Sequence, residues 1–363
     1  MTAHTGETFR VRGVTLPDGR HRDLYVVDGR ISETPVSRAE LVAEGYIVPG
    51  LVDAHCHVGL DANGAVPEDV QERQALQDRD AGTLLIRDAG SAADTRWIDQ
   101  RPDLPRIIRA GRHIARPKRY IRNFGVEIEP SELVETVIEQ ARRGDGWVKL
   151  VGDWIDRDMG DLRPCWPDDE LAAAVAAAHE EGARVTAHVF GEDALPALLA
   201  AGIDCIEHGT GLSPDLVETM AERGVALVPT RLQIDNFPEY ASRGEVKFPA
   251  YAAHMRALYA RVDETLRAAA EAGVPIYAGT DAGGVLPHGL IAKEIQLLHE
   301  RVGLSRYDAL AAGSWRAREW LGVHAGLDDG APADFVVYPS NPLDDLGVLA
   351  HPARIVLRGR IVA

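Results

Sequence analysis

Short apolar segments alternate with helical patterns through most of the chain. The apolar segments are residues 46–55, 83–90, 106–111, 147–152, 184–189, 205–210, 225–230 and 276–282. Between most of them the composition predicts helices, at residues 67–80, 131–143, 168–181, 192–201, 214–223, 250–272 and 289–301. Strands that alternate with helices are typical of a parallel sheet, and eight strands close a (β/α)8 TIM barrel. We therefore predict an α/β fold built on such a barrel, with a doubly wound open sheet as the alternative.

The pattern changes at both ends of the chain. Residues 8–46 and 330–363 consist of short strand-like stretches separated by turn signals such as Pro17-Asp18-Gly19. We expect the two ends to form one small β-sandwich domain of residues 1–46 and 330–363, beside a catalytic barrel of residues 47–329. Residues 112–129 are the longest stretch without an expected element. Because they follow the third strand, we expect them at the rim of the active site.

The composition of the chain limits the kinds of molecule that the protein is expected to bind. Apolar residues make up 45% of the 363 residues, and the formal net charge is −17. A surface of this sign repels nucleic acid and anionic membranes, and no apolar stretch reaches the roughly 18 residues that a membrane span needs. The N-terminus lacks the apolar core of a signal peptide. The cysteines, Cys56, Cys165 and Cys205, are too few for a disulfide framework. We expect a cytoplasmic protein with a small-molecule substrate, and the sequence leaves homo-oligomerisation open.

Two histidines end the first apolar segment of the predicted barrel, in the order His55-Cys56-His57. Side chains two positions apart on a strand point to the same face, so both imidazoles are expected inside the barrel. They would lie at the end where barrel enzymes carry their chemistry. Two buried imidazoles need a shared polar partner, and a zinc ion is a common one. Cys56 would point away from the interior and pack as an ordinary thiol.

Four further polar residues lie on later strands of the predicted barrel. They are Lys149 on the fourth strand, His188 on the fifth, His208 on the sixth and Asp281 on the eighth. The carboxyl ends of parallel strands meet at one mouth of a barrel. Because five separate strands carry polar groups at this end, we predict that these four residues join the two histidines in a single cluster.

Lys149 differs in chemistry from the other members of this cluster. An ammonium group would be repelled by nearby cations, and burial favours the neutral amine. A neutral amine can add carbon dioxide to form a carbamate, which resembles a carboxylate and can bridge two cations. The alternative is an ordinary lysine whose stem is buried and whose amine pairs with an acid.

The segments GLVDAHCH, VKLVG, AHVFG, IEHG and AGTDAG together resemble the motifs of the metal-dependent amidohydrolase superfamily. The chain is most similar to imidazolonepropionase-like and prolidase-like members, which have a binuclear metal site and a carbamylated lysine. The resemblance implies two divalent metals, one held by His55, His57 and Asp281, the other by His188 and His208, with carbamylated Lys149 between them. Residues 110–120, AGRHIARPKRY, replace the Gly-Gly-His stretch frequent in this subgroup, so no substrate is carried over.

The predicted function is that of a metal-dependent hydrolase that cleaves a C–N bond in a small molecule. Amide, peptide-like, cyclic amide and carbamate bonds all fit, and so does a dipeptidase-like activity. A hydroxide that bridges two metals would attack the carbonyl, and Asp281 would carry the water proton to the leaving amine. Zinc is favoured over manganese or iron. The alternatives are a mononuclear deaminase or imidazolone-ring hydrolase and a catalytically silent barrel that acts as a binding protein.

Outside the metal cluster, six residues are candidates for binding the substrate. Arg231 follows the seventh strand and could clamp a carboxylate with two hydrogen bonds. The others are His288, shortly after Asp281, and four residues of the rim stretch: His113, Arg119, Tyr120 and Arg122. A positive cluster in so acidic a chain suggests an anionic substrate. An ion-paired arginine and a solvated loop are the ordinary alternatives.

Overall fold

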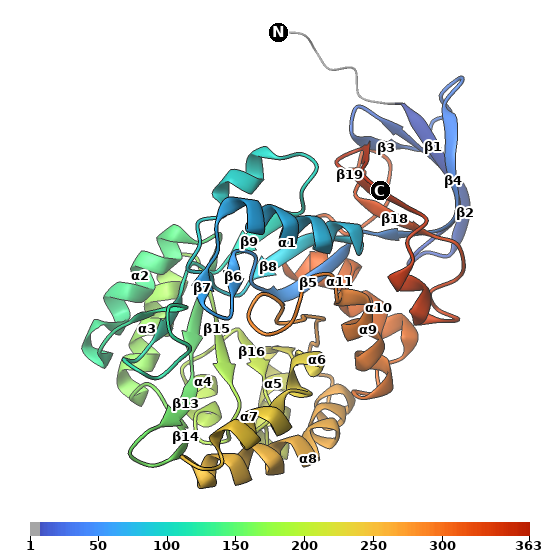
Figure 1. The fold of residues 1–363 in the computed structure, drawn as a ribbon. Coiled ribbons are helices and arrows are strands. Elements are labelled where there is room, and N and C mark those ends of the chain that lie inside the picture. The colour runs from blue at the N-terminus through green and yellow to red at the C-terminus, as the bar shows by residue number, and fades with distance from the viewer. Residues whose placement is uncertain (1–7) are drawn as a thin grey trace.

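The computed structural model describes residues 8–363 and has an α/β fold (Figure 1). Its central strands are parallel to their neighbours. They form two groups, in the orders β5-β8-β9 and β11-β10-β12-β15-β16-β17. The bounds are Leu51–Cys56 for β5, Thr83–Asp88 for β8, Arg106–Arg109 for β9, His113–Ala115 for β10, Gly125–Glu127 for β11, Trp147–Val151 for β12, Arg184–Val189 for β15, Cys205–His208 for β16 and Ala226–Val228 for β17.

One run of chain joins the two groups of strands. Residues 106–115 contain both β9, which pairs with β8, and β10, which pairs with β12. The rim stretch 112–129 was predicted to lack regular structure, and this was wrong: it contains β10 and β11. The two short strands form because backbone groups of His113–Ala115 pair with those of residues 125–127, a contact between distant turns that local sequence does not signal.

The segment after β17 contacts both edges of the central strands. The amide of Leu227 donates to the carbonyl of Pro275 (2.8 Å), and the amide of Asp281 donates to the carbonyl of His55 on β5 (2.7 Å). Residues 276–282 were predicted as a strand, but they form only isolated bridges. The left-handed backbone of Asp281, with φ of 60°, interrupts the extended geometry that a continuous ladder needs.

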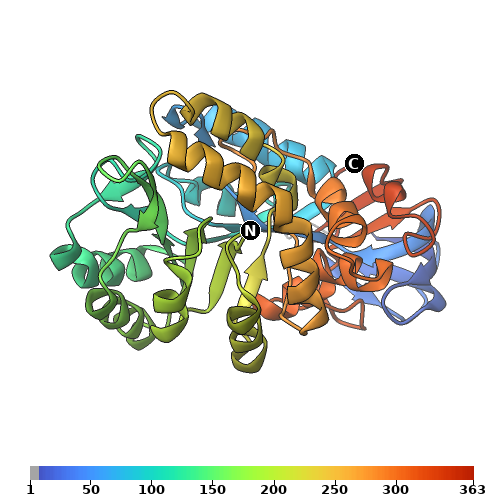
Figure 2. The same cartoon turned by 90° about the horizontal axis from the view of Figure 1, so that it is seen from below.

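Helices cover the outer side of the central strands, as the view from below shows (Figure 2). The α-helices are α1 Glu68–Asp80, α2 Leu133–Arg143, α3 Asp168–Glu180, α4 Leu195–Ala200, α5 Pro214–Arg223, α6 Arg231–Ile234, α7 Phe237–Gly244, α8 Pro249–Glu271, α9 Ile291–Glu300, α10 Arg306–Ala312 and α11 Trp315–Trp320. Short 3-10 helices lie at Arg96–Gln100 (η1), Pro130–Glu132 (η2) and Leu346–Ala350 (η3). Two small hairpins are added, β6 Leu60–Asp61 with β7 Gly64–Ala65 and β13 Asp153–Asp156 with β14 Asp161–Pro164.

Helix α3 illustrates why the local sequence predicts these helices well. Three acidic residues, 168–170, occupy its first turn, where they complement the positive end of the helix dipole. An alanine-rich stretch follows, which has high helix propensity. Four of its buried residues pack into the main core: Leu171, Ala174, Val175 and Ala178. The other predicted helices also form, although the one expected at 192–201 is limited to Leu195–Ala200.

Strands from both ends of the chain share one seven-stranded sheet, in the order β20-β19-β18-β4-β1-β2-β3. In Figure 1 the blue N-terminal strands lie beside the red C-terminal ones. The bounds are Phe9–Thr15 for β1, Arg20–Val27 for β2, Arg30–Ser32 for β3, Glu40–Pro49 for β4, Phe335–Tyr338 for β18, Arg354–Leu357 for β19 and Arg360–Ile361 for β20. Its separate apolar cluster includes Val11, Leu24, Ile47 and Phe335.

Within residues 8–363, no helix has both the length and the apolar character needed to cross a lipid bilayer.

Candidate metal centre

The polar residues at the ends of the central strands are buried. His55, His57, Lys149, His188 and His208 are each at most 4% exposed. The side chain of Asp281 is 17% exposed and reaches a pocket. Burial of so many polar groups is costly unless they have partners. The distances between their nitrogen and oxygen atoms therefore indicate whether the cluster could bind a metal ion.

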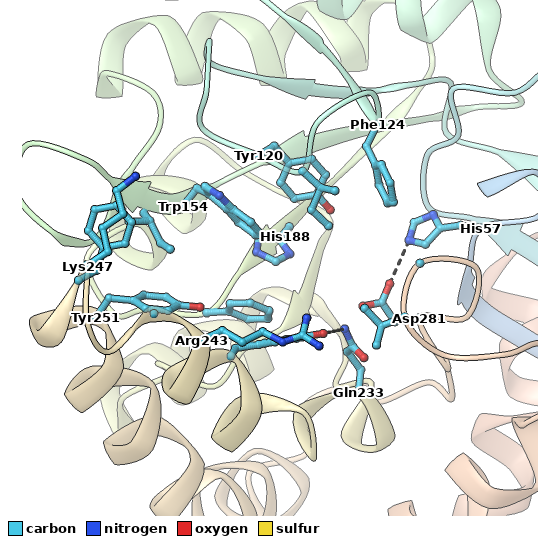
Figure 3. Close-up of a pocket in the computed structure, with 18 residues that line it drawn as sticks. His57, Tyr120, Phe124, Trp154, His188, Gln233, Arg243, Lys247, Tyr251 and Asp281 are labelled. Atoms are coloured by element: carbon cyan, nitrogen blue, oxygen red, sulfur yellow. Dashed lines mark hydrogen bonds and ion pairs between the residues drawn. The ribbon is translucent and has the colours of Figure 1, made fainter. Parts of the chain in front are cut away.

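The ligand-type atoms of the first strand and of Asp281 lie within contact distance. Nε2 of His57 is 3.0 Å from Oδ1 of Asp281, and Nε2 of His55 is 3.2 Å from the same oxygen. The two histidine Nε2 atoms are 3.2 Å apart. Ligand atoms of His55, His208 and Asp281 all lie within 4.8 Å of one another. Figure 3 shows His57 and Asp281 facing each other.

A second pair of imidazoles completes the cluster. Nδ1 of His188 lies 3.0 Å from Nε2 of His208. Burial lowers the pKa of His188 well below its usual value and that of His208 to about 3, so both imidazoles are neutral. Neutral imidazoles are the form that binds metal ions.

Each of three histidines is oriented by a partner behind it. Nδ1 of His55 lies 2.6 Å from Oε2 of Glu207, Nδ1 of His57 lies 2.7 Å from the Gly90 carbonyl, and Nδ1 of His208 lies 2.7 Å from the Thr230 hydroxyl. The glutamate and the carbonyl are acceptors for the proton on Nδ1, so Nε2 is the nitrogen of His55 and of His57 that faces the centre and that would bind a cation once it carries no proton. Such partners fix the tautomer of metal-binding histidines.

Within this cluster of six residues, two buried nitrogens have no hydrogen-bond partner among the described residues: Nζ of Lys149 and Nε2 of His188. Lys149 lies on β12, in register with Thr186 of β15. Burial lowers the pKa of its amine, which favours the uncharged form that carbamate formation requires. Several inward lone pairs and an unpartnered amine fit a site for divalent cations, because a cation would satisfy them together.

Glu207 and Arg87 form a fully buried ion pair beneath the histidines. Arg87 donates to Oε1 of Glu207 over 2.6 Å, and the hydroxyl of Thr186 donates to the same oxygen. Burial would raise the pKa of Glu207, but the attraction of Arg87 and His55 outweighs it and holds that pKa well below the usual value. The carboxylate is therefore ionised behind His55.

The sequence reasoning did not identify Glu207, although it directly precedes His208. On a regular strand, adjacent residues face opposite sides, so an inward His208 implies an outward Glu207. In the structure the backbone of His208 is left-handed, with φ of 67°, and both side chains are buried near the centre. The signal available in the sequence was a charged residue inside an otherwise apolar strand, CIEH.

Asp53 holds the segment that carries Asp281. The amide and the hydroxyl of Thr280 donate to Asp53, over 3.0 and 2.6 Å. Burial raises the pKa of Asp53 to about 7. Since Asp53 lies two positions before His55 on β5, one strand positions both the first histidines and the aspartate opposite them.

Two of the six residues predicted to bind the substrate lie beside the centre. Tyr120 lines the pocket, and its ring centre is 5.5 Å from that of His188. His113 is fully buried behind it, with ring centres 5.0 Å from Tyr120 and 5.1 Å from His57. Neither nitrogen of His113 has a hydrogen-bond partner among residues 8–363, and burial lowers its pKa well below the usual value.

The predicted arginines are placed differently. Arg231 is buried and bound to Asp263 (2.6 Å) and Asp235 (2.7 Å). Arg119 is bound to Asp156 (2.8 Å) and to carbonyls of the β13–β14 hairpin. Neither arginine lines the pocket, and neither does the exposed Arg122. The guanidinium groups of Arg231 and Arg119 are engaged by these partners, and none of the three arginines is included in the substrate site proposed below.

His288 is also turned away from the pocket. Its Nδ1 lies 2.8 Å from Oδ2 of Asp78 and 3.5 Å from Sγ of Cys56. The amide of Gly289 donates to the other oxygen of Asp78 (2.8 Å). These bonds fasten the loop after Asp281 to helix α1. The predicted packing of Cys56 away from the histidines fits its burial in an apolar cluster with Val58.

A pocket of about 370 Å³ opens directly onto the centre (Figure 3). His57, His188 and Asp281 belong to its lining. Much of the remaining wall is aromatic, contributed by Tyr120, Phe124, Trp154, Phe190, Tyr240, Phe248 and Tyr251. A pocket of this size accommodates a small organic molecule, and its position puts such a molecule against the polar cluster.

Parallel strands surrounded by helices, with histidines and an aspartate at their ends, define a class of α/β hydrolytic enzymes. The sequence model of the "Amidohydrolase family" matches residues 46–362. The chain therefore belongs to the amidohydrolase family, and it is an enzyme of the kind that acts on carbon–nitrogen bonds.

Relatives of known sequence agree with this membership. A protein of Mycobacterium tuberculosis described as uncharacterized is 58% identical over 354 residues, which covers 97% of this chain and 95% of that protein. Ochratoxinase of Aspergillus niger is 31% identical over 230 residues, 62% of this chain and 47% of the enzyme.

Solved structures show the same fold. A Xaa-Pro dipeptidase with methionine bound in its active site superposes with a TM-score of 0.81 at 23% identity, covering 98% of this chain and 99% of that one. The crystal structure of A. niger ochratoxinase gives a TM-score of 0.80 at 23% identity, covering 98% and 96%.

Proposed function

We propose that this enzyme is a metal-dependent hydrolase that holds two divalent cations, with zinc favoured, and cleaves the C–N bond of a small amide. The observation that carries the proposal is the convergence of ring nitrogens of His55, His57 and His208 on the carboxylate of Asp281. The names of the dipeptidase and ochratoxinase relatives favour a peptide-like amide over a cyclic amide or a carbamate.

We also infer that the central strands close into a (β/α)8 barrel of residues 47–329. The hydrogen bonds that residues 275–282 make with both β17 and β5 support closure. The seven-stranded terminal sheet, with its own apolar cluster, supports a separate β-sandwich domain of residues 1–46 and 330–363.

Bound divalent cations would activate a water molecule and polarise the substrate carbonyl. In our proposal, His55, His57 and Asp281 would hold one cation, His188 and His208 would hold the other, and Lys149 as a carbamate would supply a further carboxylate-like ligand. Asp281 accepts the proton of the attacking water at a carboxylate oxygen and passes it to the leaving nitrogen. Thr280, bonded to Asp53, restrains Asp281 during both transfers.

The test is hydrolysis by zinc- or manganese-loaded protein of dipeptides, N-acyl amino acids, cyclic imides and aryl carbamates. We expect amide cleavage that a chelator abolishes and added metal restores. The matched control is a His55→Asn, His57→Asn double variant, which should retain its circular dichroism spectrum but lose activity. Hydrolysis that persists in the double variant would falsify the assignment.

A mononuclear centre is the second candidate, because ligand atoms of His55, His208 and Asp281 lie within 4.8 Å of one another and could together hold one ion. A single cation there would suit a deaminase or an imidazolone-ring hydrolase. Metal content measured by plasma mass spectrometry separates the two: two ions per active chain support the binuclear proposal, and full activity with one ion supports the alternative.

A further inference from the structure

The pocket beside the metal centre combines an aromatic wall with a basic far end. Two packing contacts stiffen the wall: Tyr120 and Trp154 have ring centres 4.9 Å apart, and Phe190 and Phe237 have ring centres 4.6 Å apart. Rings held by other rings form a preformed apolar surface, which favours binding of a flat or bulky apolar group.

The lining of the pocket contains both acidic and basic side chains. Among the lining residues, Asp281 is the one with an acidic side chain, and Arg243 and Lys247 are the arginine and the lysine. In Figure 3, Lys247 lies at the opposite end of the pocket from His57 and Asp281, with aromatic side chains between them. The pocket thus presents His57 and Asp281 at one end, rings in the middle and Lys247 at the other end, and the side chain of Arg243 extends below the rings toward Gln233.

Both cations are available to a ligand. Nζ of Lys247 lies 5.1 Å from the centre of the Phe248 ring, and within residues 8–363 no carboxylate forms an ion pair with it within 4 Å. Arg243 pairs with Glu239 on the same helix, but the side chain of Arg243 is 72% exposed. Exposed pairs of this kind are weak, so a substrate anion can compete for the guanidinium.

Lys247 and Arg243 place two positive charges in the pocket lining of a chain whose net charge is −17. The acidic surface repels anions in general, and a local basic site is what allows one to bind. In an α-carboxylate substrate the anion lies next to the scissile nitrogen, close to the metal centre. Lys247 lies at the other end of the pocket, which suits an anion separated from the scissile bond by an apolar spacer.

Resting on the function proposed above, we propose a substrate class for this enzyme. The substrate is an amide with an aromatic or similarly bulky apolar arm that ends in an anionic group such as a carboxylate. The arm lies along the rings of Tyr120, Trp154 and Tyr251, and the anion contacts Lys247 and Arg243. These two residues determine specificity and take no part in the chemical step.

A set of matched amides tests the proposal. Each has a phenylalkyl arm, on either the acyl or the amine side, that ends in a carboxylate, a carboxamide or a hydrogen atom. With zinc-loaded protein we expect the carboxylate arm to give the lowest KM, by roughly 5- to 20-fold, as for a charge-assisted hydrogen bond at a partly exposed site. Lys247→Gln and Arg243→Gln should raise KM for this amide alone and leave kcat unchanged, and Lys247→Glu should raise it further.

Arg256→Gln is the matched control. Arg256 lies on helix α8, pairs with the exposed Glu245 and does not line the pocket, so its loss should leave all three amides unaffected. If the neutral arms are hydrolysed with a KM as low as that of the carboxylate arm, the proposed substrate class is wrong. The same conclusion follows if the Lys247 and Arg243 variants weaken neutral and anionic amides equally.

Binding can also be measured without hydrolysis, by calorimetry with non-hydrolysable ether analogues that carry the same three arms. This measurement tests the substrate class independently of the proposed hydrolase function. If no amide is hydrolysed by the metal-loaded protein, the hydrolase proposal fails, while the binding constants still decide whether the anion is recognised. Preferential binding of the anionic ether that Lys247→Gln reduces supports the site, and equal binding of all three ethers overturns it.

Discussion

Nδ1 of His55 lies 2.6 Å from Oε2 of Glu207, and both side chains are fully buried. The carboxylate of Glu207 accepts a hydrogen bond from the imidazole, and its other oxygen forms an ion pair with Arg87. A chain of three residues therefore connects strand β8, strand β16 and the first histidine of the centre.

We predict that Glu207→Gln lowers metal affinity about 10- to 100-fold, the usual effect of losing an orienting partner. It should also destabilise the fold by about 3 to 5 kcal/mol, because Arg87 is left as a buried unpaired charge. Chelator competition and urea denaturation measure the two effects. Glu222→Gln, an exposed change on helix α5, is the control, and a Glu207→Gln protein with unaltered metal affinity would show that the contact is only structural.

Lys149→Ala should abolish activity, since the variant cannot form the proposed carbamate bridge. Short carboxylates such as acetate or propionate should restore part of the activity, because they can occupy the space of the missing group. Rescue should depend on carboxylate concentration and should not occur with the matching amides. An active Lys149→Ala protein without added carboxylate would contradict the bridge.

Asp281→Asn should reduce kcat by roughly 100- to 10,000-fold, the range expected when a proton-transfer group is lost. Asparagine keeps the size of the side chain but cannot accept the water proton. The pH profile of kcat should lose its acidic limb in any residual activity. Metal content, measured in parallel, distinguishes a lost proton shuttle from a lost ligand, because only a ligand defect lowers the metal content to match the activity.

Metal affinity should increase with pH up to about 9. Burial would lower the pKa of His57, but bonds to Asp281 and Asp88 outweigh it and raise the pKa in the metal-free protein to about 9. Below that pH a proton must leave His57 before it can bind a cation, so affinity should fall about tenfold per pH unit. Zinc titrations at several pH values, in buffers of different ionisation enthalpy, would measure the released proton. A flat profile would rule out protonation of His57 in the metal-free centre.

Glu294 should make the fold less stable as the pH increases from about 4.5 to 8. Its carboxylate accepts the backbone amides of Arg231 and Leu232, both over 2.8 Å, yet burial raises its pKa to about 8. The unfolded chain releases this proton near pH 4.5, whereas the folded chain retains it, so raising the pH favours unfolding across this window. Glu294→Gln should reduce the slope of unfolding free energy against pH, measured by urea denaturation.

The surface change Glu222→Gln also serves as the control for the pH experiment, because its carboxyl group is exposed in helix α5. Its stability profile should match that of the parent chain. If the Glu294→Gln and parent profiles have the same slope, the buried carboxyl is already ionised in the folded state, and the backbone amides of Arg231 and Leu232 compensate for its burial.

The sequence was sufficient for features that depend on local periodicity. Strand alternation placed His55 and His57 on one face, and alanine content with acidic first-turn residues predicted helix α3. The order of strands and helices also led to the α/β class. Each of these follows from residues close together in the chain, so no knowledge of distant contacts was needed.

Features that depend on distant partners were not predictable. Arg231 resembled a free carboxylate clamp because its partner Asp263 lies on a helix further along the chain. Glu207 was missed because the left-handed backbone at His208 defeats simple alternation. The aromatic wall combines residues from separate loops, from strand β13 and from helices α7 and α8, and no short motif signals that they share one cavity.

Strand β4 has one further consequence for the way this enzyme is made. Its last residues, 46–49, pair with 335–338 of β18, and β5 with its histidines begins at Leu51. A ribosome therefore exposes β5 with its two histidines long before it synthesises β18, the strand that pairs with the end of β4. Nascent chains should stay sensitive to proteases at this junction until residues 335–338 have been synthesised, and a premature stop codon shortly before residue 335 should yield a product that quality control removes.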